Sequence, residues 1–291
     1  MESSTAPLKK KRKPIRFLVI MLLSVLIVIT YWGNTTVGVT QYTIVSDKIP
    51  AEFNQYKIVQ LSDLHDAKFG DNHLELVDKV KIIAADVIFI TGDFIDSNRY
   101  NLEQSLLLIE ELQGVAPMYY VTGNHEIATN DTERIKSALE NLDVRVLSDE
   151  AEIITLHEDS AIVIGGIEDP LSSYVDDDEA VLASMNRAFE HIHEDMFTLL
   201  LSHRPEQFEV YVEQGIDVVF SGHAHGGQFR IPGLGGLVAP GQGFFPTYTS
   251  GVHNKGDSRM VVSRGLGNSI LPIRIFNRPE IVVVTLQNEN Q

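Results

Sequence analysis

The sequence predicts one α/β domain with two β-sheets flanked by helices, preceded by one transmembrane helix. Three observations predict this fold class. Short apolar runs of strand length alternate with candidate helices. A β-rich stretch at 143–167 interrupts this alternation, as a second sheet would. A basic cluster precedes an apolar run near the N-terminus. The chain of 291 residues is long enough for one large domain with a sizeable core.

The N-terminal segment predicts a membrane anchor. Residues 1–16 form a basic tail with a Lys/Arg cluster at 9–13, and residues 17–32 form an apolar run. This run is at the short edge of the about 17–25 residues that cross a bilayer. Basic residues before the run predict a cytoplasmic N-terminus. A cleaved signal peptide is the alternative, but no good small-x-small cleavage site follows. We therefore expect a single-pass cell-membrane protein with an extracytoplasmic domain at 37–291.

The predicted domain is strongly acidic. Residues 1–16 hold six of the 23 basic residues and one of the 40 acidic ones, so the remainder has 17 basic and 39 acidic residues, a net charge of −22. A domain this acidic repels long polyanions, so we expect no nucleic-acid partner. The chain has no cysteine, which excludes disulfides and thiol chemistry. Nothing in the composition indicates an oligomeric state.

Each element follows from a local pattern. A first strand is expected at 37–45, and later strands at 58–61, 87–90, 118–121, 197–201, 218–220, 258–264 and 280–286. Helices are expected at roughly 72–84, 101–113, 131–141, 176–190 and 206–213. The window 226–256 holds nine glycines and three prolines. It predicts a long irregular loop, which is a candidate wall of the substrate site. Residues 244–248 are expected either to offer an apolar surface to substrate or lipid or to pack as an ordinary loop.

Five predicted strands are each followed by side chains that bind metals. These are Asp63, His65, Asp93, Asn124, His203, His223 and His225. Ligands collect at the carboxyl ends of parallel strands, so we expect the seven side chains to meet at one edge. Imidazole and carboxylate together suit Zn, Mn or Fe. Seven donors exceed one tetrahedral ion and fit two divalent ions that share a carboxylate, for which Asp93 is the natural bridge.

The order of these motifs resembles that of the calcineurin-like metallophosphoesterases. The matching motifs are Asp63-x-His65, Gly92-Asp93, Gly123-Asn124-His125-Glu126, His203 and Gly222-His223-Ala224-His225. Later stretches at 226–232, 263–267 and 272–281 are similar to the membrane-associated bacterial branch, so the resemblance covers nearly all of the chain after residue 36. It implies a four-layer fold and the hydrolysis of phosphoric esters.

The resemblance also implies roles for individual residues. One metal would be held by Asp63, His65, Asp93 and His225, and the other by Asp93, Asn124, His203 and His223. His125 would not be a ligand but would donate a proton to the leaving oxygen or stabilise the phosphoryl charge. Glu126 is expected either to fix the His125 imidazole or to be a solvated loop carboxylate.

One departure bears on the substrate. The stretch Asp96-Ser97-Asn98 lacks the phosphate-gripping arginine of the protein phosphatases, although Arg99 is near. We expect a phosphate ester of the cell envelope, a phosphodiester or a pyrophosphate, with lipid-linked substrates among the candidates. The alternatives are a protein or small-molecule phosphomonoesterase and a non-catalytic, metal-loaded binding protein. His125 speaks against the second alternative, because a scaffold does not need a histidine that binds no metal.

Overall fold

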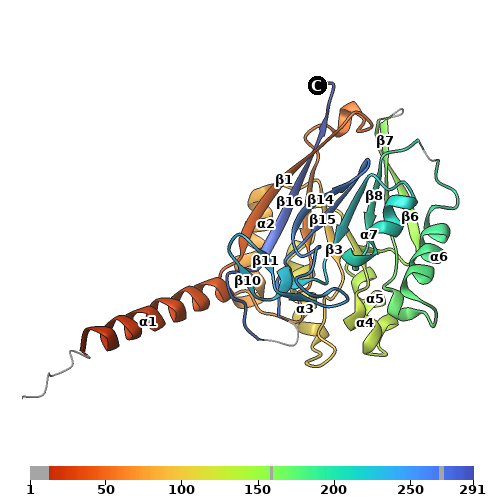
Figure 1. The fold of residues 1–291 in the computed structure, drawn as a ribbon. Helices are drawn as coiled ribbons and strands as arrows, with labels where there is room; N and C mark the ends of the chain where they lie inside the picture. The colour runs from red at the N-terminus through yellow and green to blue at the C-terminus, as the bar shows by residue number, and fades with distance from the viewer. Residues whose placement is uncertain (1–12, 158–159, 194, 269–271) are drawn as a thin grey trace, which may run out of the picture.

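The computed structural model describes residues 13–157, 160–193, 195–268 and 272–291. The domain has four layers, with two six-stranded sheets packed face to face and helices on both outer faces (Figure 1). The strand order is β1-β16-β2-β3-β4-β5 in the first sheet and β14-β15-β9-β8-β7-β6 in the second. The predicted two-sheet α/β fold is therefore confirmed.

The first sheet is mixed. Its strands are β1 (Gly38–Ser46), β16 (Glu280–Asn288), β2 (Lys57–Leu61), β3 (Val87–Thr91), β4 (Met118–Val121) and β5 (Val144–Val146). Strand β16 runs parallel to β1 and antiparallel to β2, whereas β2 to β5 are mutually parallel. The outer layer beside this sheet consists of α2 (Leu74–Ile83), α3 (Leu102–Leu112) and α5 (Thr132–Glu140).

The second sheet has a parallel centre and antiparallel edges. Its strands are β14 (Gly251–Lys255), β15 (Ser258–Val262), β9 (Val218–Ser221), β8 (Thr198–Leu201), β7 (Ser160–Gly166) and β6 (Glu150–His157). Strands β15, β9, β8 and β7 are parallel, while β14 and β6 pair antiparallel at the edges. Helices α6 (Asp177–Phe189) and α7 (Phe208–Glu213) cover its outer face.

Alternating side chains of the central strands form separate cores. Leu199 and Leu201 point between the sheets, whereas Leu200 points to the helices of the outer layer. Phe89 of β3 and Phe220 of β9 meet edge to face between the sheets, with ring centroids 5.0 Å apart. Because both faces of each central strand are buried, these strands are continuous apolar runs in the sequence.

Two predictions from the sequence are wrong. The stretch 143–167 is predicted to belong to the second sheet, but its first strand, β5, pairs with β4 in the first sheet. The window 226–256 is not wholly irregular, because it contains two short hairpins and β14. The hairpins are β10 (Arg230–Ile231) with β11 (Gly235–Gly236) and β12 (Val238–Ala239) with β13 (Gly243–Phe244).

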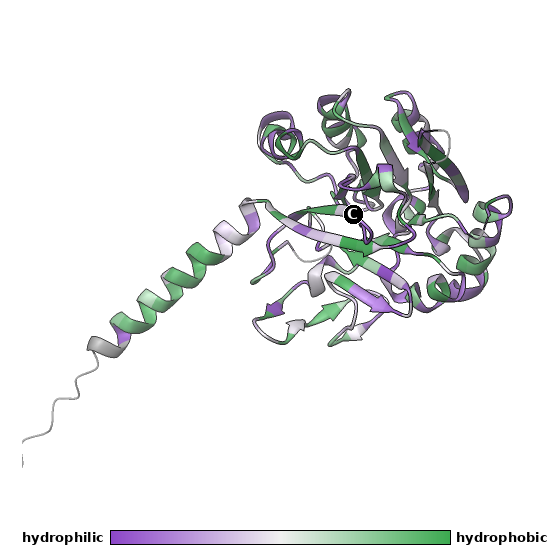
Figure 2. Ribbon diagram, turned by 90° about the horizontal axis from the view of Figure 1, so that it is seen from above, coloured by the Kyte–Doolittle hydropathy of each residue, from purple (hydrophilic) through white to green (hydrophobic). Residues whose placement is uncertain are grey.

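The N-terminal helix α1 (Lys13–Thr35) projects from the domain (Figure 1) and is apolar along most of its length (Figure 2). The stretch Arg16–Thr35 is long and apolar enough to cross a membrane, by length and composition. The side chain of Asn34 exchanges hydrogen bonds with the backbone N and O atoms of Arg274, at 2.7 and 2.8 Å. The end of the helix is thus tied to the domain.

Candidate metal centre

Five of the seven donor residues lie on sharp turns after β2, β3 and β9, while Asn124 follows β4 and His203 follows β8. Asp63, His65, Asp93, His223 and His225 all have positive φ angles, of 52°, 49°, 50°, 64° and 46°. Positive φ is uncommon for residues other than glycine and costs energy, and such strain gathers at functional sites. These turns follow strands of both sheets. The donors, which are expected at the edge of one sheet, therefore gather where the ends of two sheets meet.

Close packing explains the glycine that precedes Asp93. A Cβ atom on Gly92 would lie 2.6 Å from Nδ1 of His203 and 2.8 Å from the backbone of Gly123, and the φ angle of Gly92 is +85°. No other residue type fits this position without displacing a neighbour. The glycine therefore brings Asp93 and His203 together.

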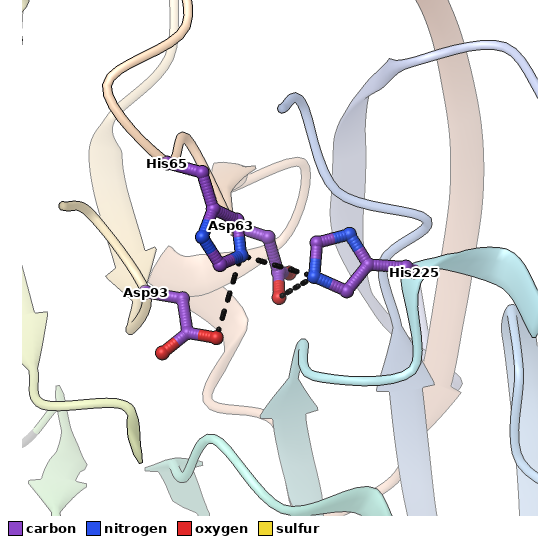
Figure 3. A group of neighbouring side chains, drawn as sticks. All are labelled: Asp63, His65, Asp93 and His225. Carbon is purple, nitrogen blue, oxygen red and sulfur yellow. Dashed lines mark hydrogen bonds and ion pairs between the residues drawn. The ribbon is translucent and has the colours of Figure 1, made fainter. Parts of the chain in front are cut away.

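The first donor group consists of Asp63, His65, Asp93 and His225, whose side chains point into one shared space (Figure 3). Nε2 of His65 lies 3.0 Å from Nε2 of His225 and 3.4 Å from Oδ2 of Asp93. Nε2 of His225 lies 3.4 Å from Oδ1 of Asp63. All four residues are buried.

The second donor group consists of Asp93, His203 and His223. Nε2 of His203 lies 3.2 Å from Oδ2 of Asp93 and 3.2 Å from Nδ1 of His223. Nδ1 of His203 is 2.8 Å from the carbonyl oxygen of Thr91, to which it can donate only if it carries the proton. Once Nε2 loses its proton, its lone pair faces the group, as in many metal-binding histidines. Asp93 is common to both groups.

The donor set fits a divalent metal site. Oδ2 of Asp63 and Oδ1 of Asn124 are buried and accept no hydrogen bond from the described residues. Buried polar atoms normally have a partner, so such orphaned oxygens call for one. Nitrogen and oxygen donors with paired Nε2 atoms facing each other are the ligand chemistry of borderline divalent metals.

The electrostatics agree with this fit. Burial lowers the pKa of His65 and of His225 to about 3, and lowers that of His223 as well, so these rings are in the neutral form that binds metals. Burial also opposes a charge on His203, but the carboxylate of Asp93 outweighs it and raises the pKa of His203 to about 10. Although burial opposes ionisation of Asp93, neighbouring imidazoles hold its pKa well below the usual range. Asp93 therefore attracts positive charge into the centre.

His125 lies beside the donor groups. Its backbone N–H donates to Oδ1 of Asp93 at 2.9 Å, and its ring stands edge-on to His65 with centroids 4.4 Å apart. Its Nδ1 accepts a hydrogen bond from the backbone N–H of Ser97 at 3.0 Å. Ser97, which stands where the protein phosphatases have their phosphate-gripping arginine, thus orients the ring.

Neither expectation for Glu126 is correct. Its carboxylate is fully buried and accepts hydrogen bonds from the backbone N–H groups of Asp93, Gly123 and Ile95, at 2.9, 2.7 and 3.0 Å. Burial, reinforced by the charge of Asp93, raises the pKa of Glu126 to about 8, while these backbone bonds lower it. Glu126 therefore fixes the turn that carries Asp93 rather than the His125 ring.

Two arginines near the donors are not predicted from the sequence. Arg204 is held by Asp169 through two hydrogen bonds of 2.6 and 2.9 Å, and its Nη1 lies 3.4 Å from Nε2 of His223. Arg274 is buried, with Nη2 3.3 Å from Nδ1 of His225. The position of Arg204 directly after His203 was an available signal, whereas no local pattern places Arg274 there.

Arg99, the arginine near the stretch Asp96-Ser97-Asn98 in the sequence, is held away from a phosphate-gripping role by its own contacts. Its Nε donates to Oδ2 of Asp96 at 2.8 Å, and its Nη2 donates to the carbonyl oxygen of Asn268 at 2.7 Å. The guanidinium is therefore engaged by Asp96 and a backbone carbonyl.

Comparison with known proteins gives a consistent result. The family model for calcineurin-like phosphoesterases matches residues 56–227, which include every donor from Asp63 to His225. The uncharacterized metallophosphoesterase YkuE of Bacillus subtilis is 30% identical over 259 residues, which cover 86% of each chain. A transmembrane protein with a metallophosphoesterase domain from Bos taurus is 28% identical over 261 residues, which cover 86% of this chain and 57% of that protein.

Proposed function

The chain belongs to the calcineurin-like phosphoesterase family and is a phosphoric ester hydrolase, and from this premise we propose that it works with two divalent metal ions bridged by Asp93. The observation that carries this proposal is the position of Oδ2 of Asp93, 3.4 Å from Nε2 of His65 and 3.2 Å from Nε2 of His203. One carboxylate thus belongs to both buried donor groups.

The proposed ligand sets follow the two groups. Asp63, His65, Asp93 and His225 would hold one ion, and Asp93, Asn124, His203 and His223 would hold the other. Zn, Mn and Fe are the candidate ions, because imidazole and carboxylate donors suit each of them. When bound, the ions would supply Lewis acidity, which stabilises charge on phosphoryl oxygens and lowers the pKa of water.

His125 is proposed to act as a hydrogen-bond or proton donor to the phosphate ester. A backbone N–H can only donate, so the bond from Ser97 requires a lone pair on Nδ1 of His125. The neutral ring then carries its proton on Nε2. This proton would serve a phosphoryl oxygen or the leaving oxygen, while the bond from the His125 backbone to Asp93 keeps the ring next to the metal centre.

The proposed substrate is a phosphodiester or pyrophosphate of the cell envelope, reached from a membrane-anchored, extracytoplasmic domain. Three observations support it. Helix α1 is long and apolar enough to span a bilayer. Ser97 occupies the place of the arginine that would grip a phosphomonoester on a protein. Phe244 and Phe245 are 83% and 74% exposed on the hairpin of β12 and β13, whose strand β12 contacts the turn His225–Gly227, and so offer apolar surface to a lipid-linked substrate.

Metal analysis combined with hydrolysis assays tests this function. The purified protein is expected to contain two divalent ions per chain and to hydrolyse a diester or a pyrophosphate faster than a monoester. A single ion per chain would overturn the bridged centre. Preference for a phosphomonoester would favour the phosphatase alternative, and metal without hydrolysis of any of the three would favour the binding protein.

A further inference from the structure

A cavity lies at the foot of α1, where the apolar helix meets the domain. Its volume is about 570 Å³. Its walls come from four parts of the chain and include Ile29, Trp32, Lys79, Arg264, Phe276 and Arg278. Residues 29 and 32 are one helical turn apart and so lie on the same side of α1. The cavity is therefore continuous with the surface of the helix that we assign to the bilayer.

Among the described residues, two cations of this cavity form no ion pair. Arg264 pairs with Glu280, whereas Lys79 and Arg278 have no carboxylate within ion-pair distance. Glu75 and Asp78 line an adjoining hollow with these two cations but do not line the cavity itself. The guanidinium of Arg278 instead stacks on the ring of Trp32, 4.3 Å from its centroid. Residues 17–291 have a net charge of −22, so two such cations in one hollow stand out from an acidic domain. They make the cavity complementary to an anion.

The apolar part of the lining decides between kinds of anion. Ile29 lies within the apolar stretch Arg16–Thr35, and Phe276 is 53% exposed on the domain side. A small inorganic anion would gain nothing from these side chains. Tryptophan and basic side chains are also the usual pair at a membrane interface, where the headgroups lie.

We propose that this cavity binds an anionic phospholipid, with its phosphate beside Lys79 and Arg278 and an acyl chain along Ile29. The site lies at the end of α1 and is separate from the metal centre. It would fix the angle at which the domain stands on the membrane, because the lipid would contact the helix and the domain at once. The proposal does not depend on the nature of the hydrolysed ester.

Trp32 is the only tryptophan of the chain, so its fluorescence reports on this cavity. The full-length protein in neutral detergent micelles is titrated with phosphatidylglycerol or phosphatidylcholine carrying brominated acyl chains, which quench a nearby tryptophan. Each cation near a bound headgroup contributes about 1 kcal/mol, so the anionic lipid should quench at a roughly thirty-fold lower concentration.

Matched variants locate the effect. The double variant Lys79→Gln and Arg278→Gln should lose the preference for the anionic lipid, while Arg278→Lys alone should keep it. A control with Lys81→Gln and Arg259→Gln removes two cations elsewhere on the domain and should also keep it. Equal quenching by both lipids in the wild type, or loss of the preference in the control variant, would overturn the proposal.

Competition separates a lipid site from a site for soluble anions. Unlabelled phosphatidylglycerol should relieve the quenching, whereas glycerol phosphate, which carries the same headgroup chemistry without acyl chains, should not relieve it at the same concentration. Equal competition by glycerol phosphate would assign the cavity to a soluble phosphate compound and reject the lipid.

Discussion

Replacing Gly92 by alanine should disable the metal centre, because the new side chain displaces a metal-binding residue by about 1 Å. The new Cβ would lie 2.6 Å from Nδ1 of His203, whereas carbon and nitrogen atoms in contact prefer about 3.5 Å. Either the ring or the Asp93 turn must therefore move by roughly 1 Å. Such a shift breaks the contact of 2.8 Å between His203 and Thr91 and opens that of 3.2 Å between His203 and Asp93.

Gly114 provides the matched control. It also has a positive φ angle, +72° against +85° at Gly92, but a Cβ atom there meets nothing within 4 Å. Alanine at either position costs about 1 kcal/mol of backbone strain, which lowers the melting temperature of a domain this size by roughly 2–4 °C. Only Gly92→Ala adds the displacement of a donor, and a misplacement of ~1 Å costs about 100-fold in activity.

The two variants are compared by metal content, thermal unfolding and kcat/KM on a soluble diester. Gly114→Ala should bind metal and turn over like the wild type, with a small loss of melting temperature. Gly92→Ala should lose metal and roughly 100-fold or more in kcat/KM. If both variants keep wild-type metal content and rate, the close approach of Gly92 and His203 does not shape the centre.

Four further predictions follow from the proposed function. Asp93→Asn should lose at least one metal and nearly all hydrolysis, since an amide offers one neutral oxygen in place of two anionic ones; elemental analysis and a rate assay check this. His125→Ala should keep both metals yet turn over poor leaving groups about 10²–10⁴-fold more slowly, with a smaller effect on an activated ester; loss of metal would contradict its assignment as a non-ligand. Protease added to intact protoplasts should digest the domain, and full protection would place it in the cytoplasm. Phe244→Ser with Phe245→Ser should slow hydrolysis of lipid-linked or micellar substrates more than that of a small diester, and equal effects would reject a lipid-facing role.

The sequence predicts the donors because their signal is local. Each of Asp63, Asp93 and His203 lies two residues after the end of a buried apolar strand, and period and polarity suffice to find that boundary. The same signal does not assign a strand to a sheet. Residues 144–146 have the pattern of a strand in either sheet, and only their pairing with β4 decides between them.

The residues that support the donors are harder to predict, because their partners are distant in the sequence. Glu126 holds the backbone of Asp93, which is 33 residues away in the chain, and nothing beside it in the sequence indicates this partner. Arg204 and Asp169 are 35 residues apart and meet only because two loops of the second sheet converge. Residues 244–248 divide between the two expectations for them, because Phe244 and Phe245 are exposed whereas the ring of Tyr248 packs against Phe208, with ring centroids 5.7 Å apart.

The place of β16 in the first sheet has a consequence for the order of folding. This strand lies between β1 and β2, so these two strands have no contact through the sheet until it arrives. The side chain of Asn288 bonds to the carbonyl oxygen of Ile49, 239 residues earlier in the chain. A nascent chain that emerges in sequence order can pair β2 with β3, but it must keep β1 unpaired and the other edge of β2 open while nearly the whole domain follows. Pairing over such separations is slow, and completion of the sheet becomes a late, cooperative step in the maturation of the protein.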